Sequence, residues 1–421
     1  MVHVISSSLV LATAASLVTV RAADASLCAP TTKDLPVAKP VIIGHRGAAG
    51  YLPDHTLEGY TLAIEAGVDF IEPDLVSTKD GVLVARHEPN MIATTDVASR
   101  PEFKARKRSA VVDGKPEEGY FVSDFTLAEL KTIRAVQPLP ERDQSFNGKY
   151  EIPTFDEIIA LVQNKTKALG RVVGIYPETK HPTWHRALKL PLEEKLLEAL
   201  AKANWTTADA PVQLAQLVDA SFSNAKTGEL TGVFTPYDWT VANRSGTYLD
   251  MLTPKGLAEI ATYADIVAPY KRYLVTTIGA KFSADGQMLD ANGDGNITDA
   301  DYVVKETPQV IHDAHAAGLK VHAWTFRDEP YRLAVNYSGN ATNEYLEFFA
   351  LGIDGLFSDN CKTAVPARDA FVKDKTAQCG ASSTNKSEAT AAPGASSHAV
   401  FTSLPAVLSV VLVAAASLAS L

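Results

Sequence analysis

The sequence predicts an α/β fold in which strands and helices alternate around a barrel. Three observations carry this prediction. Short β-rich runs alternate with helical patterns from about 40 to 373, which is typical of a parallel sheet. Eight or so such units in about 330 residues fit a (β/α) barrel better than an open sheet. Unusual polar residues fall at the carboxyl ends of several predicted strands, where barrels build their active sites.

The elements follow from residue type and spacing. Runs such as Val41-Ile42-Ile43 read as buried strands, and Leu57, Tyr60 and Ile64 recur at helical spacing. The expected strands cover 41–44, 70–76, 82–85, 172–175, 212–218, 266–268, 321–326 and 355–357. The expected helices cover 56–66, 154–168, 191–203, 254–264, 307–317, 343–351 and 363–374. The segment 88–150 is rich in charge and proline and too long for an ordinary loop, so we interpret it as a functional insertion over one face of a barrel domain at 40–374.

Composition narrows the class of protein. The 421 residues include 39 Lys and Arg against 49 Asp and Glu, a formal net charge of −10. Such an acidic balance argues against a nucleic-acid partner bound through phosphate neutralisation. Three cysteines cannot make a disulfide-dense scaffold, so a packed core must hold the fold.

Both ends of the chain read as targeting segments. Residues 1–22 predict a secretory signal peptide with small residues at its cleavage site. A Ser/Thr/Ala-rich linker at 380–398 precedes an apolar tail at 399–421, which predicts a glycosylphosphatidylinositol (GPI) anchor; a plain tail anchor is the alternative. We therefore expect a protein on the extracellular face of the plasma membrane, or alternatively a secreted one. Seven glycosylation sequons fit this route: Asn164, Asn204, Asn243, Asn296, Asn336, Asn340 and Asn385.

The polar residues at the strand ends form pairs. Glu72 and Asp74 are two apart on one strand, so both carboxylates project to one face. Glu178 and Lys180 repeat this spacing after the strand at 172–175. If the strands on either side of the turn at 79–81 fold back on each other, His87 lies roughly opposite Asp74 and faces the carboxylates.

These side chains suit phosphodiester cleavage. Glu72, Asp74 and Glu178 make an oxygen-rich site for Ca²⁺ or Mg²⁺. The Arg46 guanidinium offers a planar fork to phosphate and Lys180 adds positive charge. His45 and His87 can share the roles of general base and general acid. The chain lacks Gly-x-Ser-x-Gly and a phosphate-binding Gly-rich loop, which weakens serine-hydrolase and NTPase interpretations.

The sequence closely resembles the glycerophosphodiester phosphodiesterase family, especially its periplasmic or secreted class. The resemblance covers most of 40–372. The segments that carry it are Gly-His-Arg-Gly at 44–47, Tyr-Leu-Pro-Asp-His-Thr-Leu-Glu at 51–58, Ile-Glu-Pro-Asp-Leu-Val at 71–76, Thr-Lys-Asp-Gly-Val-Leu-Val-Ala-Arg-His-Glu at 78–88, Tyr-Pro-Glu-Thr-Lys-His-Pro at 176–182, Leu-Thr-Pro-Lys-Gly-Leu at 252–257, Val-His-Ala-Trp-Thr-Phe-Arg at 321–327 and Gly-Leu-Phe-Ser-Asp at 355–359.

The resemblance implies a TIM barrel of the phospholipase C-like phosphodiesterase type and release of glycerol 3-phosphate from glycerophosphodiesters. His45 and His87 would be the acid/base pair, with Arg46 and Lys180 on the phosphate. Trp324 would wall the glycerol pocket, or else plug the core. The implied roles of Glu72, Asp74 and Glu178 are those of metal ligands. Two other functions remain open: a catalytically impaired barrel that binds surface ligands, and a phospholipase D-like lyase acting on lipids.

One departure from the family pattern concerns the region near 205–220. A β/α unit of about two dozen residues is absent there by comparison with ordinary unit sizes. Either the barrel closes irregularly, with 229–235 as the candidate segment, or the gene model or splice form is defective. This departure is what keeps the impaired-barrel hypothesis open.

A second metal site is expected at 290–301, which matches the twelve-residue calcium loop. Its side-chain oxygens fall at ligand positions, with Asp301 in place of the usual Glu, and the bound ion would be structural. The expected ligands are Asp290, Asn292, Asp294, Thr298 and Asp301. An acidic turn without an ion is the alternative.

Barrel topology suggests a pairing for the cysteines. Cys28 and Cys379 lie near the two ends of the domain, which meet at the bottom of a barrel, so they could form a disulfide. Cys361 follows the last strand, on the catalytic face, and is expected to be a free thiol.

Overall fold

Seven short strands form the central sheet, and every pairing between neighbours is parallel. The structure is a computed structural model that describes residues 39–207, 210–213, 216–218, 235–284 and 287–384. The order across the sheet is β7 (Gly174–Ile175), β2 (Phe70–Ile71), β1 (Val41–Gly44), β14 (Gly355–Ser358), β13 (Lys320–Phe326), β10 (Ile266–Pro269) and β9 (Gln216–Val218).

One segment of chain closes this sheet into a barrel. Val212 makes a parallel bridge with Ile175 of β7, and β9, four residues further on, pairs with β10. Val212 and β9 therefore lie next to the two edges of the sheet, and the ring traced by the described residues has seven positions. Eight or so units were expected, and the part of the chain near 205–220 where one unit was expected to be missing is only partly within the described residues. In the described residues, closure involves Val212 and β9; of the segment 229–235 proposed from the sequence, 229–234 lie outside the described residues.

Helices cover the outside of the sheet, close to where their periodicity predicts them. They are α1 (Leu57–Glu65), α3 (Phe155–Leu169), α5 (Leu192–Lys202), α8 (Pro254–Ile260), α9 (Val310–Ala316), α10 (Ala341–Leu351) and α11 (Cys361–Thr384). Helix α3 shows how local sequence sets the bounds: Thr154 and Glu157 form a capping box at its start, and Gly170 ends it with a φ of 62°. Most of the buried apolar side chains lie between these helices and the strands.

The strand expected at 70–76 is in fact two strands. After β2, the chain continues past Glu72 and Pro73 as β3 (Asp74–Ser77), and after β7 it continues past Pro177 as β8 (Glu178–Thr179). Proline has no N–H to donate to a ladder, so each Pro interrupts its strand. β3 and β8 then pair with each other in parallel, and β3 pairs with the antiparallel β4 (Leu83–Ala85). The site carboxylates lie on this three-stranded extension of the barrel.

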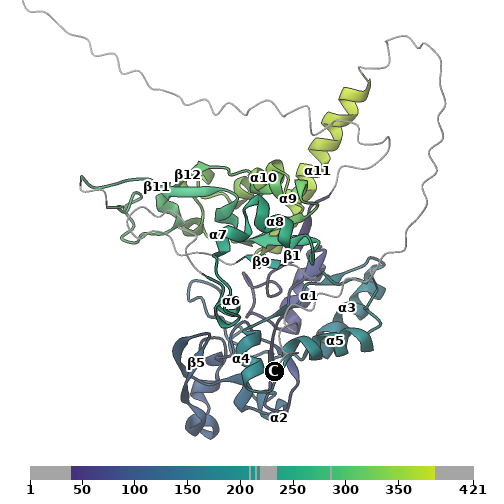
Figure 1. Ribbon diagram of the computed structural model, residues 1–421, viewed down its shortest axis with the longest axis vertical. Coiled ribbons are helices and arrows are strands. Elements are labelled where there is room, and N and C mark those ends of the chain that lie inside the picture. Colours follow the sequence, from purple (N-terminus) through teal and green to yellow (C-terminus); the bar gives the residue numbers. More distant parts are fainter. Residues whose placement is uncertain (1–38, 208–209, 214–215, 219–234, 285–286, 385–421) are drawn as a thin grey trace, which may run out of the picture.

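The insertion at 88–150 is folded around a core of its own. Its apolar side chains, among them Phe103, Phe125 and Leu130, pack with Val76 and Val84 of the extension. It contributes the hairpin β5 (Arg108–Val112)–β6 (Lys115–Gly119) and the short helix α2 (Leu127–Leu130). In Figure 1, β5 and α2 lie at the opposite end of the molecule from α9, α10 and α11. Three further short helices are α4 (Pro182–Ala187), α6 (Tyr237–Val241) and α7 (Tyr248–Met251).

A second hairpin, which the sequence did not predict, projects from one side of the barrel. β11 (Thr276–Gly279) pairs with β12 (Tyr302–Glu306), and the connection between them includes the calcium-type loop at 290–301 (Figure 1). Several 3₁₀ turns complete the described chain, including one at Lys271–Tyr273. Within the described residues, no helix is both long enough and apolar enough to cross a bilayer. The signal peptide at 1–22, the expected GPI tail and Cys28 all fall outside these residues.

Candidate active site

Three carboxylates meet where the barrel passes into its extension. Glu72 directly follows β2, and Asp74 lies beside Glu178 in the pairing of β3 with β8. One oxygen from each lies within 4.8 Å of the others, and no other described group of three or more His, Cys, Asp or Glu side chains converges in this way. The three carboxylates that the sequence groups as one oxygen-rich site therefore lie together.

The negative charges of these three carboxylates repel one another, which shifts their pKa values. Burial raises the pKa of Glu72 well above its usual range, and Asp74 and Glu178 add repulsion. Burial likewise raises the pKa of Glu178 to about 7. Burial also opposes ionisation of Asp74, but Lys180 and His55 together hold its pKa well below the usual value.

The cluster has the features of a cation site. The Oδ1 atom of Asp74 is buried without a hydrogen-bond partner. Lys180 contacts the same cluster: its Nζ lies 2.5 Å from Glu178 Oε1 and 3.6 Å from Asp74 Oδ1. An unsatisfied buried carboxylate oxygen beside two further carboxylates is what a divalent cation would complete.

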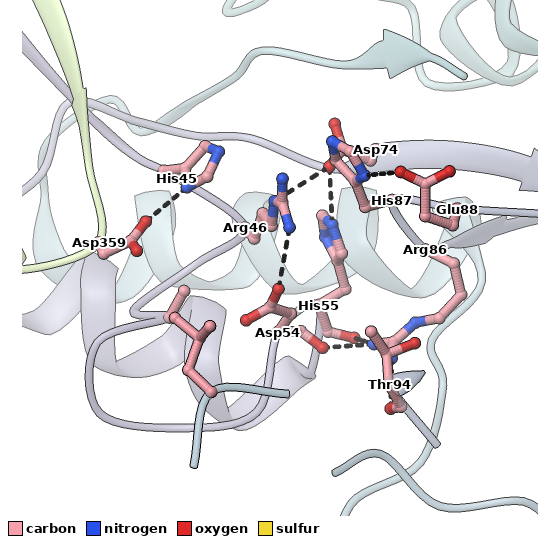
Figure 2. Close-up of polar contacts among 12 residues, drawn as sticks. His45, Arg46, Asp54, His55, Asp74, Arg86, His87, Glu88, Thr94 and Asp359 are labelled. Atoms are coloured by element: carbon pink, nitrogen blue, oxygen red, sulfur yellow. Dashed lines mark hydrogen bonds and ion pairs between the residues drawn. The ribbon is translucent and has the colours of Figure 1, made fainter. Parts of the chain in front are cut away.

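His45 lies immediately after β1, facing the cluster. Its Nδ1 is 2.5 Å from Asp359 Oδ1 (Figure 2). Its Nε2 is 3.9 Å from Glu72 Oε2. Asp359 follows β14, which is the neighbour of β1 in the barrel. Burial lowers the pKa of His45, and Arg46 lowers it further against the pull of Asp359. The Asp359 carboxylate therefore contacts Nδ1 of His45 and leaves Nε2 directed toward the carboxylate cluster.

Asp359 contacts positively charged side chains from two other segments of the chain. Its Oδ2 accepts hydrogen bonds from Arg142 Nη2 at 2.6 Å and from Arg327 Nε at 2.8 Å. Burial opposes its ionisation, but Arg327 and His45 keep its pKa well below the usual range. Arg142 belongs to the insertion, so this segment contributes directly to the environment of His45.

Arg46 follows His45 after the end of β1, and its backbone has a φ of 54°. Its backbone N–H donates to Glu72 Oε2 at 2.9 Å, and its guanidinium donates from Nη1 to Asp54 Oδ2 at 3.2 Å (Figure 2). Its Nε is 3.5 Å from Asp74 Oδ2. The guanidinium is thus oriented beside the carboxylates, where a phosphate would meet it.

His87 reaches the site by a register one residue different from the expected one. Leu75 pairs with Ala85 and the Arg86 N–H donates to the Asp74 carbonyl, so Arg86 and not His87 lies opposite Asp74. The imidazole of His87 nevertheless faces this region, where burial, Lys180 and Arg46 lower its pKa to about 3. Its Nδ1 is 2.7 Å from Glu88 Oε1 (Figure 2).

Several contributing residues were not assigned a role from the sequence. The buried His55 places Nε2 2.9 Å from Asp74 Oδ2 and Nδ1 2.8 Å from the Tyr60 hydroxyl. The guanidinium of Arg86 is buried and donates to the carbonyls of Asp54 and His55, which fixes the loop that orients both side chains (Figure 2). Asp54, His55 and Asp359 all lie in segments that carry the family resemblance, and that was the available signal.

Trp324 lies on β13, half-buried. Its indole Nε1 donates to the Ala268 carbonyl at 2.7 Å, and its ring packs against Tyr270 with centroids 5.4 Å apart. It also contacts the apolar cluster inside the barrel. The side chain therefore closes the barrel interior on one side and keeps part of its ring exposed on the other.

The calcium-type loop has its acidic side chains turned toward its own backbone. Asp290 accepts the N–H groups of Gly293 and Gly295, and Asp294 accepts that of Asn296. Asp301 is fully buried, and its carboxylate accepts the N–H groups of Ala291, Asn292 and Thr298. The three acidic side chains expected to be ligands, Asp290, Asp294 and Asp301, do not converge on one point in the described residues.

Cys361 is a free, buried thiol at the start of α11, as expected. Burial raises its pKa to about 11.

The sequence from 45 to 363 matches the family described as "Glycerophosphoryl diester phosphodiesterase family". Among curated relatives, a glycerophosphodiester phosphodiesterase of Arabidopsis thaliana is 35% identical over 348 residues, which cover 78% of this chain and 86% of the relative. A glycerophosphodiester phosphodiesterase of Haemophilus influenzae is 29% identical over 348 residues, covering 75% and 89% respectively.

Solved structures resemble the chain at a greater distance. A phosphodiesterase of Oleispira antarctica, in complex with the product sn-glycerol-3-phosphate, is 17% identical with a TM-score of 0.43; the match covers 79% of this chain and 97% of that one. A glycerophosphodiester phosphodiesterase of Agrobacterium tumefaciens is 15% identical with a TM-score of 0.41, covering 77% and 98%.

Proposed function

Because the chain belongs to the glycerophosphoryl diester phosphodiesterase family, we propose that it hydrolyses glycerophosphodiesters to glycerol 3-phosphate and an alcohol in a metal-dependent reaction. The observation that carries this proposal is the geometry of the site. His45 and His87 each turn one ring nitrogen to a carboxylate, next to a cluster of three further carboxylates at the carboxyl end of the barrel strands.

The two histidines perform the proton transfers. One takes the proton of the attacking hydroxyl, from water or from the substrate's neighbouring hydroxyl, as the new P–O bond forms. The other gives a proton to the departing alcohol oxygen as the old P–O bond breaks. Asp359 and Glu88 accept from Nδ1 of His45 and His87, which leaves Nε2 of each ring for these transfers.

The positive side chains bind the phosphate. Arg46 offers a planar pair of donors, held by Asp54, and Lys180 adds a point charge next to Glu178. Both cations offset the negative charge that gathers on phosphate oxygens as the reaction proceeds. The exposed part of the Trp324 ring supplies an apolar wall for the glycerol carbons.

Glu72, Asp74 and Glu178 would hold a divalent cation, Ca²⁺ or Mg²⁺. The fit rests on the short separation of their oxygens and on the unsatisfied Oδ1 of Asp74. When bound, such an ion polarises a phosphate oxygen and makes a nearby hydroxyl more acidic.

A coupled assay for glycerol 3-phosphate, with glycerophosphocholine as substrate, tests the function. We expect release by purified protein, and loss of about a hundredfold or more in His45→Ala and His87→Ala, since acid–base catalysis contributes about 10²–10⁴-fold. Treatment with EDTA should abolish release and added divalent metal should restore it. His312→Ala is the matched control, because His312 is exposed on α9. No release by well-folded protein would support the impaired-barrel alternative.

The same assay separates hydrolysis from lyase chemistry. A phospholipase D-like lyase would act on sphingomyelin or lysolipids and release a cyclic phosphate. The neighbours of the carboxylates include the charged groups of Arg46 and Lys180, which suit a phosphodiester with a small polar headgroup. We therefore expect glycerophosphocholine to be turned over and intact lipids to be ignored.

For the loop at 290–301 we propose a structural Ca²⁺. Support comes from the sequence match and from Gly295, which has a φ of 89° at the position where the calcium loop turns sharply. Asp301 would have to exchange backbone donors for the ion. Calorimetric titration with Ca²⁺, in wild type and in Asp290→Asn, tests this second site; equal heats in both would leave the loop as an acidic turn.

The location proposed is the extracellular face of the plasma membrane, reached by a signal peptide and held by a GPI anchor. The sequence patterns support it, and the six sequon asparagines among the described residues are all exposed. Release from cells by a phosphatidylinositol-specific phospholipase C, together with a mass shift after glycosidase treatment, is the expected result. Retention on the membrane after lipase treatment would instead favour a plain tail anchor.

A further inference from the structure

A chain of hydrogen bonds runs from His87 away from the active site. Glu88 accepts from His87 Nδ1 with Oε1, at 2.7 Å, and contacts His181 Nε2 with Oε2, at 3.1 Å. The other nitrogen of His181, Nδ1, is 2.6 Å from Asp113 Oδ2. Four side chains therefore connect the proposed catalytic imidazole to the tip of the β5–β6 hairpin in the insertion.

The two distant members are fixed in place by their backbones. Asp113 and Gly114 form the hairpin turn with φ values of 46° and 78°, the geometry of the tight turns that suit twisted strands. His181 also has a positive φ, 51°, and Pro182 follows it at the first position of α4. Between them, Val112 of β5 packs with Phe121 and Trp184, so the hairpin and α4 share one apolar contact.

The charges along the chain are complementary. His181 lies between two carboxylates, and although burial opposes its charge, Asp113 and Glu88 raise its pKa to about 9. At neutral pH it therefore donates from both nitrogens, one to each carboxylate. Glu88, held from behind by this cation, is left with Oε1 to accept from His87 Nδ1.

His45 is held in the same manner on the other side of the site. There the carboxylate is Asp359, and the cation behind it is Arg142, which again comes from the insertion. Each proposed catalytic imidazole thus has a carboxylate on Nδ1, and each carboxylate has a cation behind it. The two arrangements differ in that the cation behind Glu88 is an imidazolium with a carboxylate of its own.

From this geometry we propose that His181 and Asp113 are positioning residues for His87: they fix Glu88 so that His87 keeps its proton on Nδ1 and presents Nε2 to the substrate. The proposal rests on the proposed phosphodiesterase function and assigns the β5–β6 hairpin a part in it. It differs from a merely structural role, in which the Asp113–His181 contact only fastens the hairpin to α4.

Kinetics of Asp113→Asn test the proposal, because Asp113 is remote from the carboxylate cluster. We expect kcat for glycerophosphocholine to fall about tenfold or more with KM little changed, since general acid–base catalysis supplies about 10²–10⁴-fold and its loss is partial here. Lys115→Ala is the matched control, an exposed change in the same hairpin. In a Glu88→Gln background, Asp113→Asn should cost little more, because it acts through Glu88.

A spectroscopic measurement makes the outcome independent of turnover. Long-range ¹H–¹⁵N spectra of histidine-labelled protein report which ring nitrogen of His87 carries the proton. We expect Nδ1–H alone in wild type and a mixture of both tautomers in Asp113→Asn and His181→Gln, with Lys115→Ala like wild type.

The two readouts separate the possible failures. If His87 keeps one tautomer in both variants, or if kcat stays within about twofold while only the melting temperature falls, the contact is structural and the proposal is overturned. If the wild type shows the expected tautomer and the variants lose it, but no glycerophosphodiester is hydrolysed, the positioning chain stands and the proposed reaction fails.

Discussion

Asp359 is the residue on which the geometry of His45 depends most directly, since it joins the imidazole to two arginines. Replacing it by asparagine keeps its size but allows its amide to donate to Nδ1, which favours the wrong tautomer. We expect Asp359→Asn to lower kcat by about 10²–10⁴-fold, by analogy with the aspartate of serine-protease triads. The glycerol 3-phosphate assay gives this number.

A control for Asp359→Asn is available on α11, the helix that follows Asp359 in the chain. Asp374→Asn changes an exposed carboxylate on α11 and should leave kcat within about twofold, as surface substitutions away from special features usually do. Equal activity of both variants would show that His45 does not need its carboxylate.

The raised pKa of His181 predicts how the free energy of unfolding changes with pH. Its pKa is raised to about 9 in the folded protein, against about 6.5 for an unperturbed histidine. Because the folded state binds the proton more tightly, this stabilisation is complete below about pH 6.5 and is lost as the pH rises through about 9. Urea denaturation between pH 6 and 9.5 should therefore show a decline in wild type that is smaller in His181→Gln. Parallel curves for the two proteins would contradict the raised pKa.

At the scale of single residues, the sequence predicted the charged and polar side chains of the site, which are costly to bury. It did not predict the residues that bind and orient them. His45, Arg46, Glu72, Asp74 and Glu178 follow strands at a spacing that can be read directly. The contact from His45 to Asp359 spans 314 residues of sequence and exists because β1 lies beside β14. No local pattern encodes a neighbour of that kind, and only knowledge of the strand order would have supplied it.

At the scale of elements, periodicity located most of the predicted helices within a few residues, although α11 continues to Thr384, well past its predicted end at 374, and the strands shifted as well. Glu72 and Pro73 divide the strand predicted at 70–76, and the pairing of β3 with β4 placed Arg86 opposite Asp74. A one-residue change of register reverses the face of every side chain in a strand. His87 still reaches the site because it lies just beyond the end of β4, where the ladder no longer fixes its direction.

The insertion is an element whose packing can be tested separately. Phe125 is fully buried and meets Phe103 edge to face, with centroids 5.1 Å apart. We expect Phe125→Ala to lower the free energy of unfolding by about 3–5 kcal/mol, the usual cost of removing a buried aromatic ring. Denaturant unfolding followed by circular dichroism measures it, and Val111→Ala, at a 60% exposed site, should cost little.

The same experiment asks whether the insertion unfolds by itself. Its core includes Val76 and Val84, which lie on the strands that carry Asp74 and lead to His87. Because the two units share these side chains, a single transition is expected in Phe125→Ala. An early separate transition that leaves the barrel folded would show that the insertion is an independent domain.

At the scale of the whole molecule, the described residues trace a seven-membered ring of strands that keeps the candidate site together. Val212 and β9 close the ring between β7 and β10, whereas His45, Glu72 and Asp359 follow β1, β2 and β14, respectively, which are adjoining strands. The departure that raised doubt about activity therefore lies beside β7, which leads to Glu178, and away from the strands that lead to His45, Glu72 and Asp359. The sequence could show that a unit was short, but not which segment would close the ring.

The net charge of −10 includes the carboxylates of Glu72, Asp74 and Glu178, which repel one another, and this gives a prediction for the stability of the whole protein. Burial and repulsion raise the pKa of Glu72, so its charge destabilises the metal-free fold near neutral pH. We expect Glu72→Gln to melt at a higher temperature than wild type in EDTA. Its amide oxygen can still accept from the Arg46 N–H, so the main change is the loss of charge.

With divalent metal the order should reverse. A cation bound only by the folded protein stabilises it by about 2.7 kcal/mol at a hundredfold excess over Kd, and Glu72→Gln loses a ligand and most of this gain. Scanning calorimetry with EDTA, Mg²⁺ or Ca²⁺ measures both states. Asp290→Asn isolates the second site: it should respond to Mg²⁺ like wild type, and less to Ca²⁺ if the loop at 290–301 binds it. Equal metal responses in wild type and Glu72→Gln would mean that the carboxylate cluster holds no ion, and metal dependence would then have to be explained elsewhere.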